Sequence, residues 1–237
     1  MKRENYLGVN VCNVNMDQAL DKIDEIIEGR EPSFVVAINP EKIMKAAKDE
    51  ELLKLLNSAA IQIPDGVGVL VASRLKGGSI RTRVTGIDLM YGICENAAKK
   101  GHRIYLLGAK PGVAIMAGEI LIKRYQGLKI VGIRDGYFKD ENEIISDIKE
   151  KAPDILFVAM GSPKQEHWIT GHMKDLGVPL LMGVGGSFDV TCGNIKRAPA
   201  WMCSLGLEWM YRLIKEPWRY KRMLVLPQFL VKVVMKR

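Results

Sequence analysis

The sequence is poor in the residues that hold metal ions or form disulfides. It has three histidines and four cysteines among 237 residues, and no two cysteines have the C-x-x-C spacing. No two aspartates stand two positions apart, so the D-x-D pair that often holds a divalent cation is absent as well. We therefore expect no metal site, no cofactor, and reduced cysteines of the kind found in cytosolic proteins.

The familiar nucleotide-binding motifs are also missing in their full form. There is neither a G-x-x-x-x-G-K-[ST] loop nor a G-x-G-x-x-G segment that opens a helix after the first strand. Their absence argues against an ATPase and against a dehydrogenase. No apolar run reaches the about 18 residues that cross a bilayer, and no apolar segment follows the first charges as it would in a secretory signal. We expect a cytoplasmic protein whose membrane contact can only be peripheral.

Charge of one sign is concentrated at one end of the chain. The formal net charge is +8, and residues 195–237 account for all of it, with ten Lys or Arg against two acidic residues. The same segment holds three of the four tryptophans and an apolar run at residues 223–235. Basic residues, aromatic residues and an apolar stretch together favour contact with an anionic membrane surface. A basic tail that binds nucleic acid is expected to lack the apolar run.

Short apolar runs alternate along the chain with longer stretches of helical periodicity. We expect strands at residues 34–38, 61–63, 103–107, 129–133, 155–159 and 178–182. We expect helices at residues 40–57, 66–75, 87–99, 113–125, 141–150 and 163–176. Nearly apolar strands separated by helices are typical of a mostly parallel sheet with helices on both faces. The predicted organisation is an α/β domain over residues 1–194, with a small hairpin within residues 6–14, and a helical C-terminal appendage over residues 195–237 that divides near Pro217.

Polar and glycine-rich turns follow all six predicted strands. They lie at residues 39–40, 64–66, 108–112, 135–137, 161–166 and 183–189. Ligands of open parallel sheets bind beyond the carboxyl ends of the strands, where loops meet helix N-termini. A single glycine there is more often a helix cap or a turn residue. Six such turns at one edge nevertheless predict an anion-binding, nucleotide-binding cleft.

Asp65 is the acidic residue with the clearest catalytic placement. It follows the apolar run at residues 61–63 and precedes Gly66 and a predicted helix. A carboxylate at the end of a strand could act as a general base on a substrate hydroxyl. Aspartate is also a favoured helix N-cap, and the spacing leaves these two alternatives open.

Without a metal ion, the charge of a diphosphate must be met by arginines, lysines and helix N-termini. Arg83 is one candidate, and Arg212, Arg219 and Arg222 of the basic tail are others. An arginine considered alone is more often a solvated surface charge.

The motifs, taken in order, resemble the WecG/TagA/CpsF family of bacterial glycosyltransferases, and within it the TagA type. The resemblance rests on residues 39–40, 65–66, 83–86, 107–108, 135–138, 161–166, 183–189 and 197–199, and on Glu208, Trp209, Arg212, Glu216, Pro217, Arg219 and Arg222. It covers most of the chain. The one departure is Ala37, where many relatives are expected to have a hydroxyl residue.

The resemblance implies an inverting, metal-independent transfer on a Rossmann-like α/β fold. The TagA type moves N-acetylmannosamine from UDP to undecaprenyl-diphospho-N-acetylglucosamine, in the linkage unit of wall teichoic acid. By this resemblance Asp65 is the general base, with Arg83 and Gln165 also catalytic. The residues implied in substrate binding are Asn39, Gly108, Tyr137, Gly161, Gly185, Asp189, Arg212, Arg219 and Arg222. The basic tail would then cover the active site at the inner face of the cell membrane.

Three alternatives stay open at this stage. The donor sugar could be another, such as UDP-N-acetylmannosaminuronate or UDP-glucose. The chain could be a nucleic-acid-binding α/β protein that uses its basic tail as the contact surface. It could also be a nucleotide-binding regulator whose tail forms a homo-oligomer interface. The sequence does not decide the oligomeric state.

Overall fold

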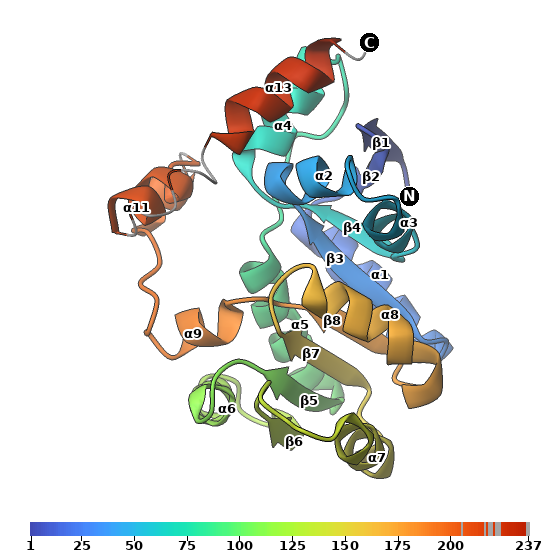
Figure 1. The fold of residues 1–237 in the computed structure, drawn as a ribbon. Helices are drawn as coiled ribbons and strands as arrows, with labels where there is room; N and C mark the ends of the chain where they lie inside the picture. Colours follow the sequence, from blue (N-terminus) through green and yellow to red (C-terminus); the bar gives the residue numbers. More distant parts are fainter. Residues whose placement is uncertain (205, 216, 218–219, 221–223, 236–237) are drawn as a thin grey trace.

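The computed structural model describes residues 1–204, 206–215, 217, 220 and 224–235 (Figure 1). Its centre is a six-stranded sheet with the strand order β4-β3-β8-β7-β5-β6, in which every pair is parallel. The strands are β3 (Ser33–Ile38), β4 (Ile61–Pro64), β5 (Arg103–Gly108), β6 (Lys129–Arg134), β7 (Ile155–Ala159) and β8 (Leu180–Gly183). The sequence-based prediction of a Rossmann-like, mostly parallel sheet is confirmed.

Helices cover both faces of this sheet (Figure 1). The helices of one layer contribute side chains to the same buried cluster. They are α2 (Pro40–Ala46), α3 (Glu50–Asn57), α4 (Val67–Leu75), α7 (Glu141–Lys151) and α8 (Lys164–Leu176). The other layer contains α1 (Met16–Gly29), α5 (Gly86–Lys100), α6 (Val113–Arg124) and the short α9 (Ser187–Thr191). An antiparallel pair, β1 (Arg3–Tyr6) and β2 (Val9–Cys12), packs beside the first layer.

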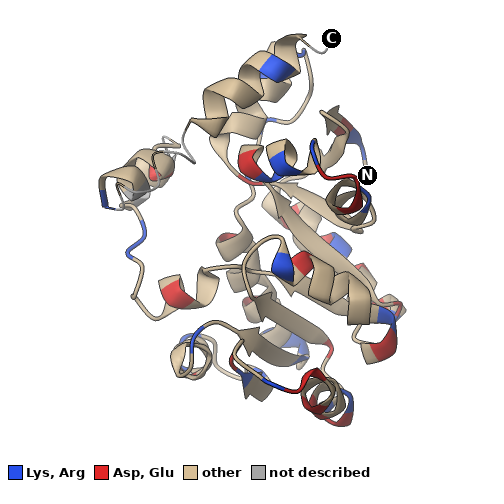
Figure 2. Ribbon diagram, in the orientation of Figure 1, with Lys and Arg blue, Asp and Glu red and all other residues tan. Residues whose placement is uncertain are grey.

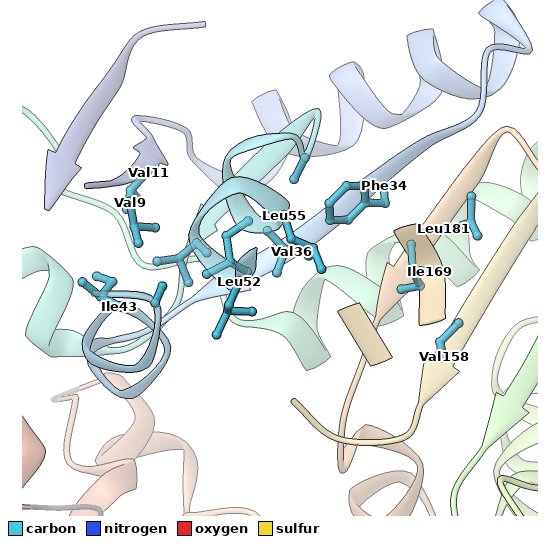
Figure 3. Packing of buried hydrophobic residues seen from close by; sticks show 14 of the residues in the cluster. Val9, Val11, Phe34, Val36, Ile43, Leu52, Leu55, Val158, Ile169 and Leu181 are labelled. Carbon is cyan, nitrogen blue, oxygen red and sulfur yellow. The ribbon is translucent and has the colours of Figure 1, made fainter. Parts of the chain in front are cut away.

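The strands are nearly continuous apolar runs because both of their faces are buried. In β3, Phe34, Val36 and Ile38 belong to the cluster on one face, whereas Val35 belongs to the cluster on the other. This alternation is the two-residue period of an extended chain. Figure 3 shows part of the first cluster, in which side chains of β3 meet those of α2 and α3.

Within residues 1–57, three features differ from the sequence-based expectation by more than one residue. The helix expected over residues 40–57 is two helices, because Asp49 caps α3 by accepting a hydrogen bond from the Leu52 N–H at 3.0 Å. The N-terminal hairpin turns at Leu7 and Gly8 and therefore begins at residue 3 rather than at residue 6. Helix α1 was not expected, although Asn15 and Gln18 form a capping box at its start.

Among the described residues, three further helices follow the α/β body, as predicted for the C-terminal segment. They are α10 (Ala200–Ser204), α11 (Glu208–Lys215) and α13 (Val225–Met235). Helix α13 packs on α2 and α4 (Figure 1), and its Phe229 and Val233 are fully buried in the first core cluster. The Phe229 ring also meets the Tyr6 ring edge-on, with 6.4 Å between ring centroids. One face of α13 is thus part of the core, and the division of the chain at residue 194 stays a prediction.

The opposite face of α13 is exposed and apolar. Val231 and Met235 are 56% and 80% exposed. Lys232 is the one charged residue within Val225–Met235, and the ribbon of this helix is mostly tan in Figure 2. Among the described residues, no helix combines the length and the hydropathy needed to cross a bilayer.

Candidate active site

A cavity of about 540 Å³ opens at the carboxyl ends of four neighbouring strands, β4, β3, β8 and β7. Its volume lies within the range of pockets that bind small molecules. The lining residues are Ala37, Asn39, Lys42, Asp65, Gly66, Val67, Arg83, Thr85, Gly86, Ile87, Gly161, Ser162, Gln165, Gly183, Val184, Gly185, Gly186, Ser187, Val190, Ile195, Gly206, Glu208 and Trp209. The last four of them belong to the C-terminal segment, so this segment forms one wall of the cavity.

Asn39 and Asp65 are placed by the ends of two paired strands. Asn39 caps α2, since its side chain accepts a hydrogen bond from the Lys42 N–H at 2.9 Å. The Asp65 N–H donates to the Ile38 carbonyl at 2.8 Å, which fixes the start of the next turn. Gly66 follows with a φ of +93°, a conformation that favours glycine, and it occupies the N-cap position of α4. Asp65 is therefore not the cap of that helix, and its carboxylate lines the cavity instead.

Arg83 lies between Asp65 and the C-terminal segment. Its Nε is 4.0 Å from Asp65 Oδ1, and its Nη2 donates a hydrogen bond to Glu208 Oε2. The side chains of Arg83 and Glu208 are only 16% and 10% exposed. The guanidinium thus holds a positive charge at the end of β4 and joins α11 to the sheet.

Gln165 reaches the cavity from the first turn of α8. Its Oε1 accepts a hydrogen bond from the Gly185 N–H at 3.0 Å, which ties α8 to the loop after β8. Its Nε2 donates to Glu166 Oε1 at 3.1 Å, and Glu166 in turn pairs with Lys42. Gln165 as a whole residue is 3% exposed.

The connection between α9 and α10 is held to the body by a second ion pair. Arg197 donates through Nη1 and Nη2 to the two carboxylate oxygens of Asp88, each at 2.6 Å, and Thr85 Oγ1 donates to the same carboxylate at 2.6 Å. Burial raises the pKa of Asp88, but the hydrogen bonds from Arg197 and Thr85 outweigh it and bring that pKa below its ordinary value. The hydrogen bond to Asp88 raises the pKa of Arg197.

The model of the WecG/TagA/CpsF family of glycosyl transferases matches residues 4–237. The chain belongs to this glycosyltransferase family. It is 37% identical over 235 residues to the N-acetylglucosaminyldiphosphoundecaprenol N-acetyl-beta-D-mannosaminyltransferase of Bacillus subtilis (strain 168), covering 99% of this chain and 92% of the relative. It is also 37% identical over 202 residues to the enzyme of that name from Bacillus spizizenii, covering 85% of this chain and 79% of the relative. The chain is a transferase, and the nucleic-acid and regulator alternatives are set aside.

Six residues predicted to form the site of this glycosyltransferase lie together in the cavity. They are Asn39, Asp65, Arg83, Gly161, Gln165 and Gly185. Five of them follow the ends of four different strands, and Arg83 lies in the connection between α4 and α5. They are spread over residues 39–185, and the strand order brings those four strand ends together.

Three predicted residues of the glycosyltransferase do not line this cavity. Gly108 ends β5 and Tyr137 follows β6, and these are the two strands at the opposite edge of the sheet. At about 4.8 Å per strand, β6 ends about 19 Å from β3. Gly108 has a packing role, since a Cβ there would lie 2.4 Å from the Ala159 carbonyl oxygen. Asp189 lies on α9, outside the lining. The substrate-binding roles of these three residues stay predictions.

The structure describes the three tail arginines only in part. Arg212 belongs to α11, but its side chain is not described. Arg219 and Arg222 lie outside the described residues. Their proposed contacts with a diphosphate therefore stay predictions as well.

The structure adds lining residues to the glycosyltransferase site that the sequence did not single out. Lys42 and Thr85 are the main ones. Each stands at a helix start, Lys42 three positions after the cap Asn39 and Thr85 as the cap of α5. For Lys42 the available signal was the cap Asn39 at a predicted strand end, and for Thr85 it was the start of the helix expected at residues 87–99.

Among the residues that the structure describes, no cluster of three or more His, Cys, Asp or Glu side chains is arranged to hold a metal ion. The independence of the reaction from metal ions stays a prediction, to be tested by experiment.

Proposed function

We propose that this glycosyltransferase transfers N-acetylmannosamine from UDP-N-acetylmannosamine to undecaprenyl-diphospho-N-acetylglucosamine, which builds the linkage unit of wall teichoic acid. The observation that carries the proposal is the placement of Asp65 inside the cavity, 4.0 Å from Arg83. The activity for which two relatives are named, each 37% identical over most of the chain, supports this choice of transferred sugar and acceptor.

In the proposed reaction Asp65 acts as the general base. The acceptor hydroxyl gives its proton to the Asp65 carboxylate while its oxygen forms a bond to the anomeric carbon of the donor sugar. The bond between that carbon and the phosphate oxygen breaks, and the electron pair leaves with UDP. One displacement of this kind inverts the anomeric configuration.

The departing diphosphate must meet positive charge or hydrogen-bond donors as it leaves. Arg83 supplies a guanidinium at the cavity wall, and the N-termini of α2 and α8 begin at the same strand ends. Charge-assisted hydrogen bonds of this type strengthen as charge develops on the leaving oxygen. Arg212, Arg219 and Arg222 are proposed to add to them from the tail.

The C-terminal segment is proposed to hold the enzyme on the inner face of the cell membrane, where a polyprenyl acceptor resides. Among its described residues, the large exposed apolar or aromatic ones are Trp201, Trp209, Ile214, Tyr220, Leu224, Val231, Val234 and Met235. An amphipathic surface of this composition, with basic residues nearby, binds anionic interfaces without crossing them. The same segment lines the cavity through Glu208 and Trp209, so membrane contact and the active site lie on one element.

The test is the release of UDP from UDP-N-acetylmannosamine in the presence of a short-chain lipid-diphospho-N-acetylglucosamine. UDP-glucose and UDP-N-acetylmannosaminuronate, the two alternative donors, serve as controls. The proposal requires release that depends on the acceptor and is fastest with UDP-N-acetylmannosamine. Faster release from either control donor would reassign the donor sugar.

A further inference from the structure

A buried ion pair lies beside the cavity, between α2 and α8. Lys42 Nζ is 2.7 Å from Glu166 Oε1, and the two side chains are 8% and 1% exposed. Removing two charges from water is costly, and a well-packed apolar pair is often as stable or more so. The stability of the core is therefore not a sufficient reason for this ion pair.

Glu166 Oε1 receives a second donor, the Gln165 amide. Gln165 Nε2 donates to it at 3.1 Å, while Gln165 Oε1 accepts from the Gly185 N–H at 3.0 Å. The reversed amide would place an oxygen against the carboxylate and an NH₂ group against the Gly185 N–H. Both contacts would be repulsive in a buried site. Glu166 and Gly185 thus allow one orientation of this amide.

The neighbouring strand leaves room for the amide in that orientation. Gly183, at the end of β8, would place a Cβ only 2.4 Å from Gln165 Nε2. Any larger residue at position 183 would displace the amide from its place between Glu166 and Gly185.

One amide proton of Gln165 has no acceptor among the described residues. Nε2 carries two protons, of which one goes to Glu166. Among the described residues the second proton has no acceptor, and Gln165 lines the cavity. The fixed amide therefore presents a hydrogen-bond donor where a substrate oxygen can accept it.

We propose that Lys42 and Glu166 are positioning residues, which hold the Gln165 amide so that its N–H meets an oxygen of the nucleotide sugar. Lys42 fixes the Glu166 carboxylate, and the carboxylate fixes Gln165. The oxygen belongs either to the diphosphate or to the sugar N-acetyl group, which share this acceptor chemistry. The inference rests on the proposed function, because that function supplies the nucleotide sugar.

The decisive variant replaces both partners at once, as Lys42→Met with Glu166→Met. Because both charges are removed together and the volume is kept, we expect this variant to fold, with a thermal midpoint close to that of the wild type. Its kcat/KM should nevertheless fall about 10–100-fold, the scale of a misplaced substrate contact. The single variant Glu166→Gln keeps the shape of the side chain and removes its charge, and its kcat/KM should also be lower than that of the wild type.

The matched control is Lys149→Met with Asp175→Met. It removes the exposed ion pair of 2.6 Å between α7 and α8 and should change kcat/KM by less than about twofold.

A double-mutant cycle separates positioning from a general structural effect. In a Gln165→Ala background, the paired change at Lys42 and Glu166 should cost no further activity, because the residue through which it acts is gone. Two results would overturn the proposal. One is that the activity losses of Gln165→Ala and of the paired change multiply, and the other is that the paired variant keeps a kcat/KM within about twofold of the wild type.

Titration with UDP alone identifies the substrate oxygen and does not depend on turnover. Weaker UDP binding by the paired variant assigns the amide to the diphosphate. Unchanged UDP binding with a raised KM for the nucleotide sugar assigns it to the N-acetyl group. If the wild-type enzyme transfers a different sugar, the proposed function is wrong. The double-mutant cycle is then run with that sugar, so the positioning role is tested all the same. Unchanged UDP binding together with unchanged kinetics for the active donor would contradict the positioning role.

Discussion

Arg83 donates a hydrogen bond to Glu208, a residue 125 positions further along the chain, and so ties α11 to the carboxyl edge of the sheet. The same guanidinium lies 4.0 Å from the proposed base, Asp65. The residue that is proposed to meet the diphosphate is therefore also the attachment point of the C-terminal segment. Substrate binding and the position of that segment should be coupled through Arg83.

Glu208→Ala should loosen the C-terminal segment. Removing one partner of a largely buried ion pair costs about 3–5 kcal/mol. Here the loss should weaken the attachment of α11 to the body rather than the stability of the sheet. Trypsin cleavage within residues 196–215 should therefore accelerate about tenfold or more. Glu119→Ala, on the exposed face of α6, is the control and should leave the rate unchanged. Equal cleavage rates for the two variants would show that Arg83 and Glu208 do not hold this segment.

Asp88 should contribute to stability in a pH-dependent way. Because its pKa is lower in the folded protein than in the unfolded chain, the unfolded chain takes up its proton at the higher pH. The contribution is complete above about pH 4 and is lost as the pH falls below that value. In urea unfolding, Asp88→Asn should be less stable than the wild type at pH 7, and the difference should shrink in acid. Arg197→Gln should behave in the same way, and a difference that grows in acid would contradict this assignment.

The two faces of α13 should respond differently to substitution. Phe229 is fully buried, so Phe229→Ala should lower the free energy of unfolding by about 3–5 kcal/mol. Val231 is 56% exposed, so Val231→Asp should leave that free energy within about 0.5 kcal/mol of the wild type. Val231→Asp should nevertheless weaken sedimentation with vesicles that contain anionic lipids. Undiminished vesicle binding by Val231→Asp would place the membrane contact elsewhere.

Activity should survive EDTA. The sequence has no D-x-D pair, and the proposed neutralisation of the diphosphate relies on arginines and helix N-termini. Turnover after chelation, followed by addition of Mg²⁺ or Mn²⁺, checks this. A strict requirement for either ion would mean that the diphosphate is neutralised by a metal instead.

The strands were predictable from the sequence because both faces of this sheet are buried. The apolar run at residues 155–159 coincides with β7, and the run at residues 129–133 lies within β6. The break between α2 and α3 was missed, because a single capping residue, Asp49, interrupts a continuous helical pattern.

The candidate site was only half predictable, for a different reason. Polar turns mark every strand end, but the sequence does not show which strands are neighbours. The order places β5 and β6 at the far edge, which separates Gly108 and Tyr137 from Asp65. Contacts such as that between Lys42 and Glu166 join residues 124 positions apart, and no local spacing predicts them.

The role of Asp65 as the base of a sugar transfer from a UDP donor can be tested in one comparison of three proteins. Acceptor-dependent UDP release from UDP-N-acetylmannosamine is measured for the wild type, for Asp65→Asn and for Asp49→Asn. Asp49 only caps α3, and asparagine caps as well as aspartate does, so that control should keep full activity. Asp65→Asn should fold normally and lose about 10²-fold or more in kcat. Wild-type turnover by Asp65→Asn, with the wild type itself active, would contradict the account.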